Sequence, residues 1–130
     1  MTPFGAKLRE LRASRKVTMA EMASALGVSS AYLSALEHGR RGAPTWALVQ
    51  RTISYFNIIW DDAEELCRLA QVSEPRVKID TAGLLPQATA FANLLAKSIQ
   101  FLGQDDFAAL SHIVDSAIAR ASADARQPAK

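Results

Sequence analysis

A short segment of the chain carries small polar side chains at a spacing of four residues: Ser30, Ser34 and His38. Residues four apart share one face of a helix, and Ala31 and Ala35 lie beside them on this face. A serine hydroxyl can donate to or accept from a base edge or a phosphate, and an alanine methyl group can contact a thymine methyl group. The face could therefore contact nucleic acid, although the same residues also suit the solvent side of a short helix.

Basic residues flank this segment on both sides. Arg12, Arg15 and Lys16 precede it, and Arg40 and Arg41 follow it in a loop. Guanidinium groups bind phosphates in a bidentate manner, so these residues are candidate phosphate contacts. The alternatives are a solvated basic face and a mobile basic loop. The charge distribution favours phosphate contact: positions 1–60 hold eight basic and three acidic residues, whereas 61–130 hold seven and ten.

Two short helices joined by a tight turn would position these side chains. Thr18 and Glu21 have the spacing of a capping box, and Ser29 can cap the second helix. Gly27 between them tolerates the left-handed conformation in which a helix often ends. The inward positions are apolar, namely Met22, Leu26, Val28, Leu33 and Leu36. The pattern is that of a helix-turn-helix, whose second helix enters the major groove of DNA.

Apolar residues at helical spacing predict further helices around this pair. In the first half, helices are expected at 3–15, 18–26 and 29–38. A fourth helix is predicted to start at Pro44 and Thr45, with Trp46 in the core, and to stop at Asn57. A fifth is expected to be capped by Asp61.

The second half has a different organisation. Residues 73–83 read as a linker in which RVKID, at 76–80, could form a short strand. Two amphipathic helices within 84–121 follow, the first ending at Gly103 and the second capped by Asp105 or Asp106. They form a helical hairpin with one open apolar side, which must cover the first half of the chain, pair with a second copy or bind a partner. The tail, 122–130, is expected to fray.

Other function classes lack their signatures. No apolar run approaches the ~18 residues of a membrane span, and no secretion signal is apparent. The single cysteine, Cys67, fits a reducing cytosol and a core or interface position. Neither a nucleophile–base arrangement, a phosphate-binding glycine loop nor a zinc motif occurs. The acidic run at 61–65 is explained by a helix start. We therefore expect no enzyme, no metal and no cofactor.

These residues resemble those of the Cro/C1-type (lambda-repressor-like, XRE) helix-turn-helix family over positions 8–58. The matching pieces are LRELR at 8–12, TMAEMASALGVS at 18–29, YLSALEHGRR at 32–41 and PT at 44–45. The resemblance implies an all-α fold, with a five-helix DNA-binding domain at 1–72 ahead of the linker and the hairpin. It also implies binding to double-stranded DNA in the cytoplasm, usually as a homodimer on a pseudo-palindromic operator.

The resemblance assigns roles to individual residues. It implies that Arg12 and Glu37 form an ion pair that braces the second helix of the motif while Arg12 reaches a phosphate. Base readers fall at Ser30, Ala31, Ser34 and Ala35. Backbone contacts fall at Ser29, Tyr32, His38 and Arg40, to which the basic pattern adds Arg15, Lys16 and Arg41.

Two functions follow. The first is a sequence-specific transcriptional regulator, in its simplest form a repressor. The second is an antitoxin-like regulator whose C-terminal helices bind a partner protein.

Overall fold

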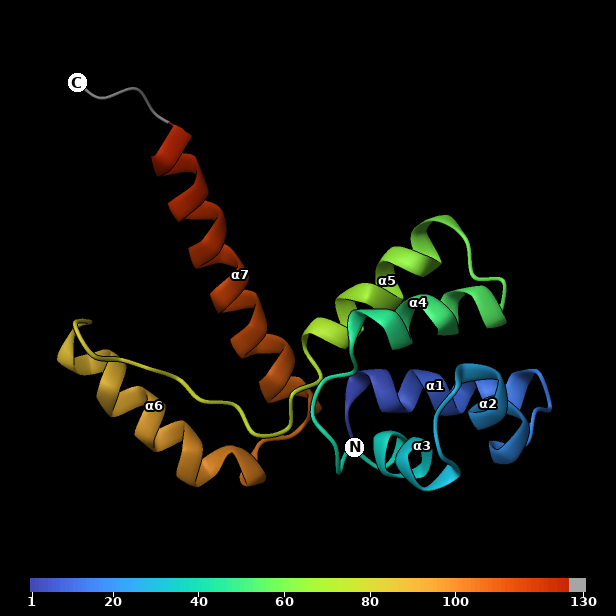
Figure 1. Cartoon of the computed structure of the whole chain (residues 1–130). Helices are drawn as coiled ribbons and strands as arrows, with labels where there is room; N and C mark the ends of the chain where they lie inside the picture. The colour runs from blue at the N-terminus through green and yellow to red at the C-terminus, as the bar shows by residue number, and fades with distance from the viewer. Residues whose placement is uncertain (127–130) are drawn as a thin grey trace. The chain divides into compact units, whose positions relative to one another are not determined.

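The computed structural model describes residues 1–126, whose regular structure is entirely helical, and the segment 76–80 forms no strand there. The strand prediction was wrong, because this segment has no neighbouring strand with which to pair. The chain divides into two compact units, Met1–Lys78 and Ile79–Lys130. The first contains five helices, α1 Pro3–Ser14, α2 Met19–Leu26, α3 Ser30–Glu37, α4 Trp46–Tyr55 and α5 Trp60–Gln71 (Figure 1).

Hydroxyl side chains begin four of these five helices. The side chains of Thr2, Thr18, Ser29 and Thr45 each accept a hydrogen bond from the backbone N–H three residues later, at 3.0–3.2 Å. Each bond satisfies an N–H group that the helix leaves free, which stabilises the fold by about 1 kcal/mol. The caps predicted at Thr18 and Ser29 are thus confirmed.

Left-handed residues end two helices where the sequence predicts it. Gly27 has φ 71° after α2, and Asn57 has φ 53° just after α4. Glycine adopts this conformation without steric cost, and asparagine tolerates it better than most residues. The turn at Gly27 lets Val28 fold back onto the core before α3 begins.

The core of the first unit forms where α1 packs on α3 and α5, and where α2 packs on α3 and α4. Its buried apolar side chains come from all five helices: Phe4, Leu8, Met22, Ala23, Leu26, Leu33, Leu36, Leu48, Val49, Phe56, Leu66 and Ala70. This core holds the two helices of the predicted motif, which are too short to be stable alone.

Two expectations about α4 and α5 were wrong. Trp46 is 69% exposed, because the buried side of α4 begins only at Leu48. Asp61 does not cap α5, because the N-cap is Ile59, two residues earlier, which makes no side-chain hydrogen bond. Asp61 instead lies in the first turn of α5, where its negative charge still favours the helix.

The first unit extends beyond its expected boundary. Ser73 is 2% exposed, and its hydroxyl oxygen accepts a hydrogen bond from the backbone N–H of Phe4 at 2.9 Å. The carboxylate of Glu74 accepts from the N–H of Ala43 at 3.2 Å. These two residues look like linker in the sequence, yet they hold α1 and the loop after α3.

Replacing Ser73 with alanine is expected to lower the free energy of unfolding by about 1–2 kcal/mol, because the buried N–H of Phe4 then has no acceptor. Chemical denaturation of the full chain would measure the change. Ser14→Ala, at an exposed serine of α1, the helix that carries Phe4, is the matched control. Equal effects of the two substitutions would show that Ser73 does not hold the unit together.

The second unit contains α6 Pro86–Ser98, the 3-10 turn η1 Ile99–Phe101 and α7 Gln104–Arg126. The first predicted helix, 84–102, is therefore shorter and ends in a tighter turn. Neither Asp105 nor Asp106 is the N-cap of α7; both lie in its first turn, and the Asp106 carboxylate accepts from the Gly103 N–H at 3.0 Å. Of the tail that is expected to fray, residues 122–126 continue α7, and 127–130 lie outside the described residues.

The two long helices of this unit do not close on each other. Only Leu102 and Gly103 separate η1 from α7, so the connection is as short as a hairpin requires. However, α6 and α7 diverge from this connection (Figure 1), and none of residues 79–125 is buried. A pair of amphipathic helices cannot enclose a core alone, so both apolar faces stay open. None of the helices described is long and apolar enough to cross a membrane.

Candidate nucleic-acid interface

Helix α3 presents the predicted base readers on its open side. Leu33 and Leu36 are buried against α1 and α2, which fixes the rotation of the helix. Ser30 and Ala31 are exposed on the other side. Ser34 and Ala35 continue that side and are half-buried. The four predicted readers therefore lie on a surface that no other described element covers completely.

An ion pair braces the end of α3 against α1. The Arg12 guanidinium donates from Nε to Glu37 Oε1 at 3.0 Å and from Nη2 to Oε2 at 3.3 Å. The Glu37 side chain is 2% exposed and that of Arg12 26%. Such a two-point contact fixes orientation as well as distance. The pair implied by the resemblance is thus present, and Glu37 is a buried structural residue.

The loop after α3 folds back along the helix. The N–H of Arg40 donates to the carbonyl of Ala35 at 2.9 Å. The Arg41 guanidinium carbon lies 5.3 Å from the centre of the Tyr32 ring, a cation–π contact. Both arginines remain exposed, so their charges are available near the open side of α3. Glu74 holds the next part of the loop through Ala43.

Both ends of α3 carry polar groups that could hold a phosphate. Ser29 accepts from the Tyr32 N–H at 3.0 Å, and its hydroxyl proton remains available to a phosphate oxygen. The N-terminal end of a helix also favours a negative charge. At the other end, His38 Nδ1 lies 2.7 Å from the Ser34 carbonyl, so the exposed imidazole is held in one orientation.

The family assignment follows from the extent of the match. The family model described as a helix-turn-helix domain matches residues 3–78, more than half of the chain and all five helices of the first unit. The chain belongs to the helix-turn-helix family. It is a DNA-binding transcriptional regulator, as the sequence predicts.

Two Bacillus subtilis (strain 168) proteins are similar to this helix-turn-helix chain. The HTH-type transcriptional repressor RghR is 32% identical over 119 residues, which cover 86% of this chain and 88% of RghR. The uncharacterized HTH-type transcriptional regulator RghRB is 39% identical over 62 residues, 48% of this chain and 45% of RghRB. The similarity to RghR thus extends over both units, whereas the match to RghRB covers less than half of each protein.

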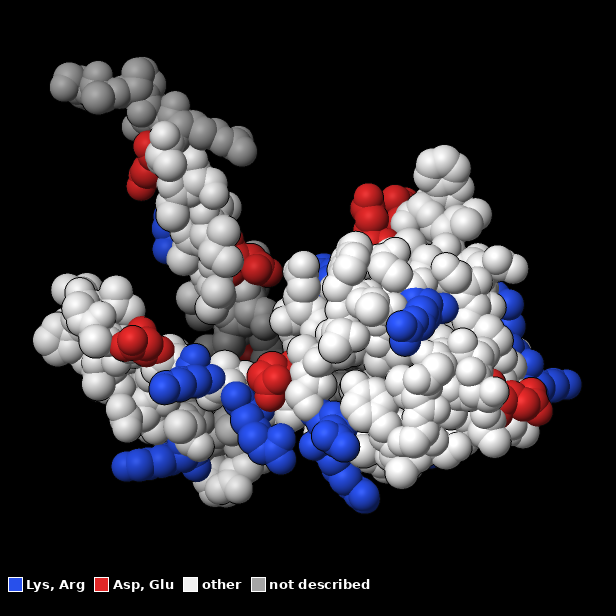
Figure 2. Space-filling model, viewed as in Figure 1, with Lys and Arg blue, Asp and Glu red and all other residues white. Residues whose placement is uncertain are grey.

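Of the two basic residues that follow Arg12, only Arg15 is less free to contact a phosphate than the sequence suggests. Arg15 donates from Nη2 to the Phe56 carbonyl at 3.0 Å, and its guanidinium carbon lies 6.0 Å from the centre of the Phe56 ring. Lys16, left-handed at φ 55°, is exposed. On the face that Figure 2 shows, basic side chains of the domain lie at separate places.

Two positioning residues of the helix-turn-helix domain escape sequence analysis. Arg51 donates to the Leu26 carbonyl at 3.3 Å, next to the turn between α2 and α3. The Glu74 carboxylate accepts a hydrogen bond from the N–H of Ala43, 31 positions away, and so holds the loop that follows Arg40 and Arg41. No local pattern marks either residue, because each acts on a segment distant in sequence.

The acidic run at 61–65 has an electrostatic explanation. Glu65 accepts two hydrogen bonds from Arg68, at 2.9 and 2.7 Å. This contact lowers the pKa of Glu65 and raises that of Arg68. Asp61 and Asp62 lie in the first turn of α5, where negative charge is favourable. No cluster of potential metal ligands is found among residues 1–126.

Proposed function

We propose that this regulator is a repressor that binds a pseudo-palindromic operator as a homodimer and acts in the cytoplasm, where it meets the DNA. The observation that carries the proposal is the open side of α3, whose small side chains allow close approach to a groove and whose far end is braced by the buried Arg12–Glu37 pair. The name of RghR, a transcriptional repressor that aligns with most of this chain, supports repression.

We assign base readout to Ser30, Ala31, Ser34 and Ala35. The two hydroxyl groups can donate to or accept from base edges, and the two methyl groups can contact thymine. None of these side chains makes the bidentate contacts of arginine, asparagine or glutamine. Part of the specificity therefore comes from the shape and deformability of the DNA.

We assign backbone contacts to residues around both ends of α3 and the end of α1. Positive charges there neutralise phosphates and release counterions, which makes binding depend strongly on salt. Arg12 and Arg15 can contribute only the edges of their guanidinium groups that face solvent, since their other edges are bonded within the protein. The full set is Arg12, Arg15, Lys16, Ser29, Tyr32, His38, Arg40 and Arg41.

The Arg40→Ala and Arg41→Ala variants are expected to weaken binding to all DNA sequences by similar factors. Each should also reduce the slope of log affinity against log salt by about one, as expected for a lost phosphate contact. Titrations at several salt concentrations, with operator and unrelated DNA, would measure both effects. Arg68→Ala removes an equal charge from α5 and is the control. Unchanged binding by both loop variants would contradict this docking.

Selection of bound DNA from a random pool tests the whole proposal. The expected product is two inverted half-sites, about one helical turn or a multiple of it apart, because a symmetric dimer presents two α3 helices to successive major grooves. Failure to enrich any sequence would contradict specific readout. A single half-site would contradict the dimer but leave readout by α3 standing.

The second candidate is an antitoxin-like regulator whose C-terminal helices hold a partner protein. The open apolar faces of α6 and α7 favour it, because exposed patches of this kind mark interaction sites. Which occupant covers these faces decides between the two candidates.

A further inference from the structure

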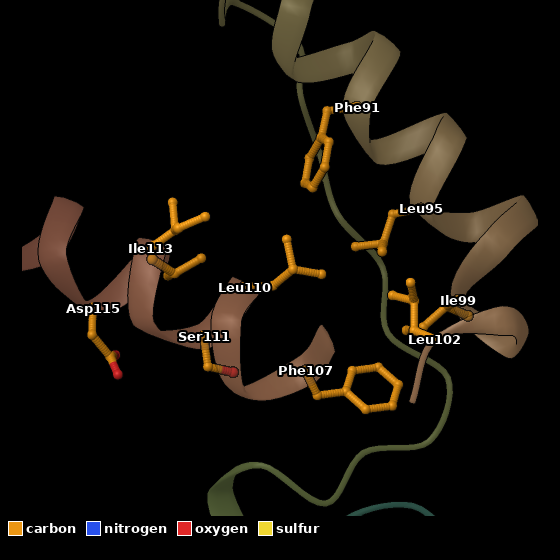
Figure 3. Close-up of a pocket in the computed structure, with 10 residues that line it drawn as sticks. Phe91, Leu95, Ile99, Leu102, Phe107, Leu110, Ser111, Ile113 and Asp115 are labelled. Carbon is orange, nitrogen blue, oxygen red and sulfur yellow. The ribbon is translucent and has the colours of Figure 1, made fainter. Parts of the chain in front are cut away.

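The second unit exposes an unusually large apolar surface. A groove of about 370 Å³ opens between α6 and α7, and Figure 3 shows Phe91 and Leu95 reaching into it from one helix and Phe107 and Leu110 from the other. Ten large apolar residues between positions 84 and 118 are 43–77% exposed: Leu84, Leu85, Phe91, Leu94, Ile99, Phe101, Phe107, Ile113, Val114 and Ile118.

The total apolar area that these residues expose is comparable to that of a stable protein interface, and five of them, Phe91, Ile99, Phe107, Ile113 and Val114, line the groove. If each of the ten residues offers roughly 100 Å² of exposed surface, the unit offers about 1,000 Å² per chain. A specific complex typically buries about 800 Å² on each partner. Surfaces of this size on monomeric proteins are uncommon, so the surface is expected to be covered by another protein chain.

The pattern along α7 indicates which chain covers it. Phe107, Leu110, Val114 and Ala117 are spaced alternately three and four residues apart, as the core positions of a coiled coil are. When two copies of such a helix run antiparallel, Leu110 of one can lie opposite Val114 of the other. In the same register, Phe107 lies opposite Ala117, so a large side chain meets a small one at each end.

The flanking charges fit the same register. Asp106, Ile113 and Arg120 follow one another at intervals of seven and therefore line one edge of the apolar stripe. Antiparallel pairing brings Asp106 against Arg120 of the second copy twice, with the two Ile113 side chains in contact between them. Asp106 and Arg120 cannot pair within one helix, because fourteen positions correspond to about 21 Å.

We propose that α7 pairs antiparallel with α7 of a second copy of this chain, with Asp106 and Arg120 as reciprocal partners. The apolar faces of both α6 helices complete a four-helix interface. The inference rests on the proposed function and deepens it, since it names the surface that makes the repressor a homodimer. The two-fold axis of this interface relates two DNA-binding domains, as a pseudo-palindrome requires.

Charge reversals in the full chain test the proposal. The dissociation constant of the dimer would be measured by sedimentation equilibrium without DNA. Asp106→Arg and Arg120→Asp should each raise it by roughly tenfold or more, because two attractive pairs become repulsive. The double variant, D106R with R120D, should return it to within about threefold of the parent value, because both pairs are restored in the opposite sense.

Asp105→Arg is the matched control, since Asp105 is adjacent in sequence but lies on the far side of the helix from the apolar stripe. It should leave the dimer nearly unchanged, and rescue in the double variant would show that the single reversals weaken the dimer through the charge pairs and not through loss of the Asp106–Gly103 hydrogen bond. Three results would overturn the proposal: a monomeric parent protein, single reversals no worse than Asp105→Arg, or no rescue. A monomer that still selects one DNA half-site would refute the interface alone, whereas a dimer without DNA selectivity would refute the proposed function.

Discussion

Replacing Ser30 with glutamate is expected to lower the affinity for operator DNA by roughly a hundredfold or more, because juxtaposed like charges cost several kcal/mol at an interface. Ser30 is the first residue of α3 and is exposed. A carboxylate there would face the base edges and phosphates of the groove. Titration of the selected operator at fixed salt would measure the loss.

The same substitution should not harm the fold, which separates binding from stability. A negative charge in the first turn of a helix is favourable, so the melting temperature should stay the same or rise slightly. Ser54→Glu changes the net charge equally at an exposed position of α4 and should retain most of the affinity. If Ser30→Glu bound the operator as well as Ser54→Glu, α3 could not be the helix that enters the groove.

Replacing Gly5 with valine is expected to lower the free energy of unfolding by about 3 kcal/mol, near the upper end of what an overpacked site costs. A Cβ atom at this position would lie 2.5 Å from the carbonyl oxygen of Leu36 and 2.9 Å from that of Glu37. Both are backbone atoms, so the clash is relieved only by moving α1 away from the end of α3.

Ala6→Val is the matched control for this prediction. It introduces the same side chain, valine, at the next position of α1, which is exposed. The free energy of unfolding should therefore fall by only about 0.5 kcal/mol, because valine has a lower helix propensity than alanine. Urea denaturation of both variants would give the comparison. Equal stabilities would mean that α1 does not approach α3 as closely as the structure shows. DNA affinity should also fall in Gly5→Val, since the shift displaces Glu37 from Arg12.

Because α3 offers few base-specific contacts, the affinity for operator DNA should depend strongly on dimerisation. Two hydroxyl and two methyl groups per chain provide few base-specific contacts. Linking two such domains through the proposed α7 interface turns the second binding event into an intramolecular one, which raises the overall affinity without new contacts. Loss of the dimer would therefore affect operator binding more than it would in a protein with strong bidentate readers.

Sequence alone predicted the elements whose structure depends on near neighbours. The positions of α1, α2 and α3, the caps at Thr18 and Ser29 and the left-handed turn at Gly27 follow from residues within four positions of one another. The side of α3 that faces the core follows from Leu33 and Leu36 for the same reason. The Arg12–Glu37 pair spans 25 positions and came instead from the resemblance to a family.

Tertiary structure alone decided the features that depend on residues distant in sequence. The packing of α4 buries the side that begins at Leu48, so Trp46 is exposed. Arg15 donates a hydrogen bond to the Phe56 carbonyl, 41 positions away. Ser73 and Glu74 became part of the first unit because they accept hydrogen bonds from segments 69 and 31 positions away. Local propensity and periodicity do not encode such pairings, since burial and the supply of backbone donors are set only when the helices pack together.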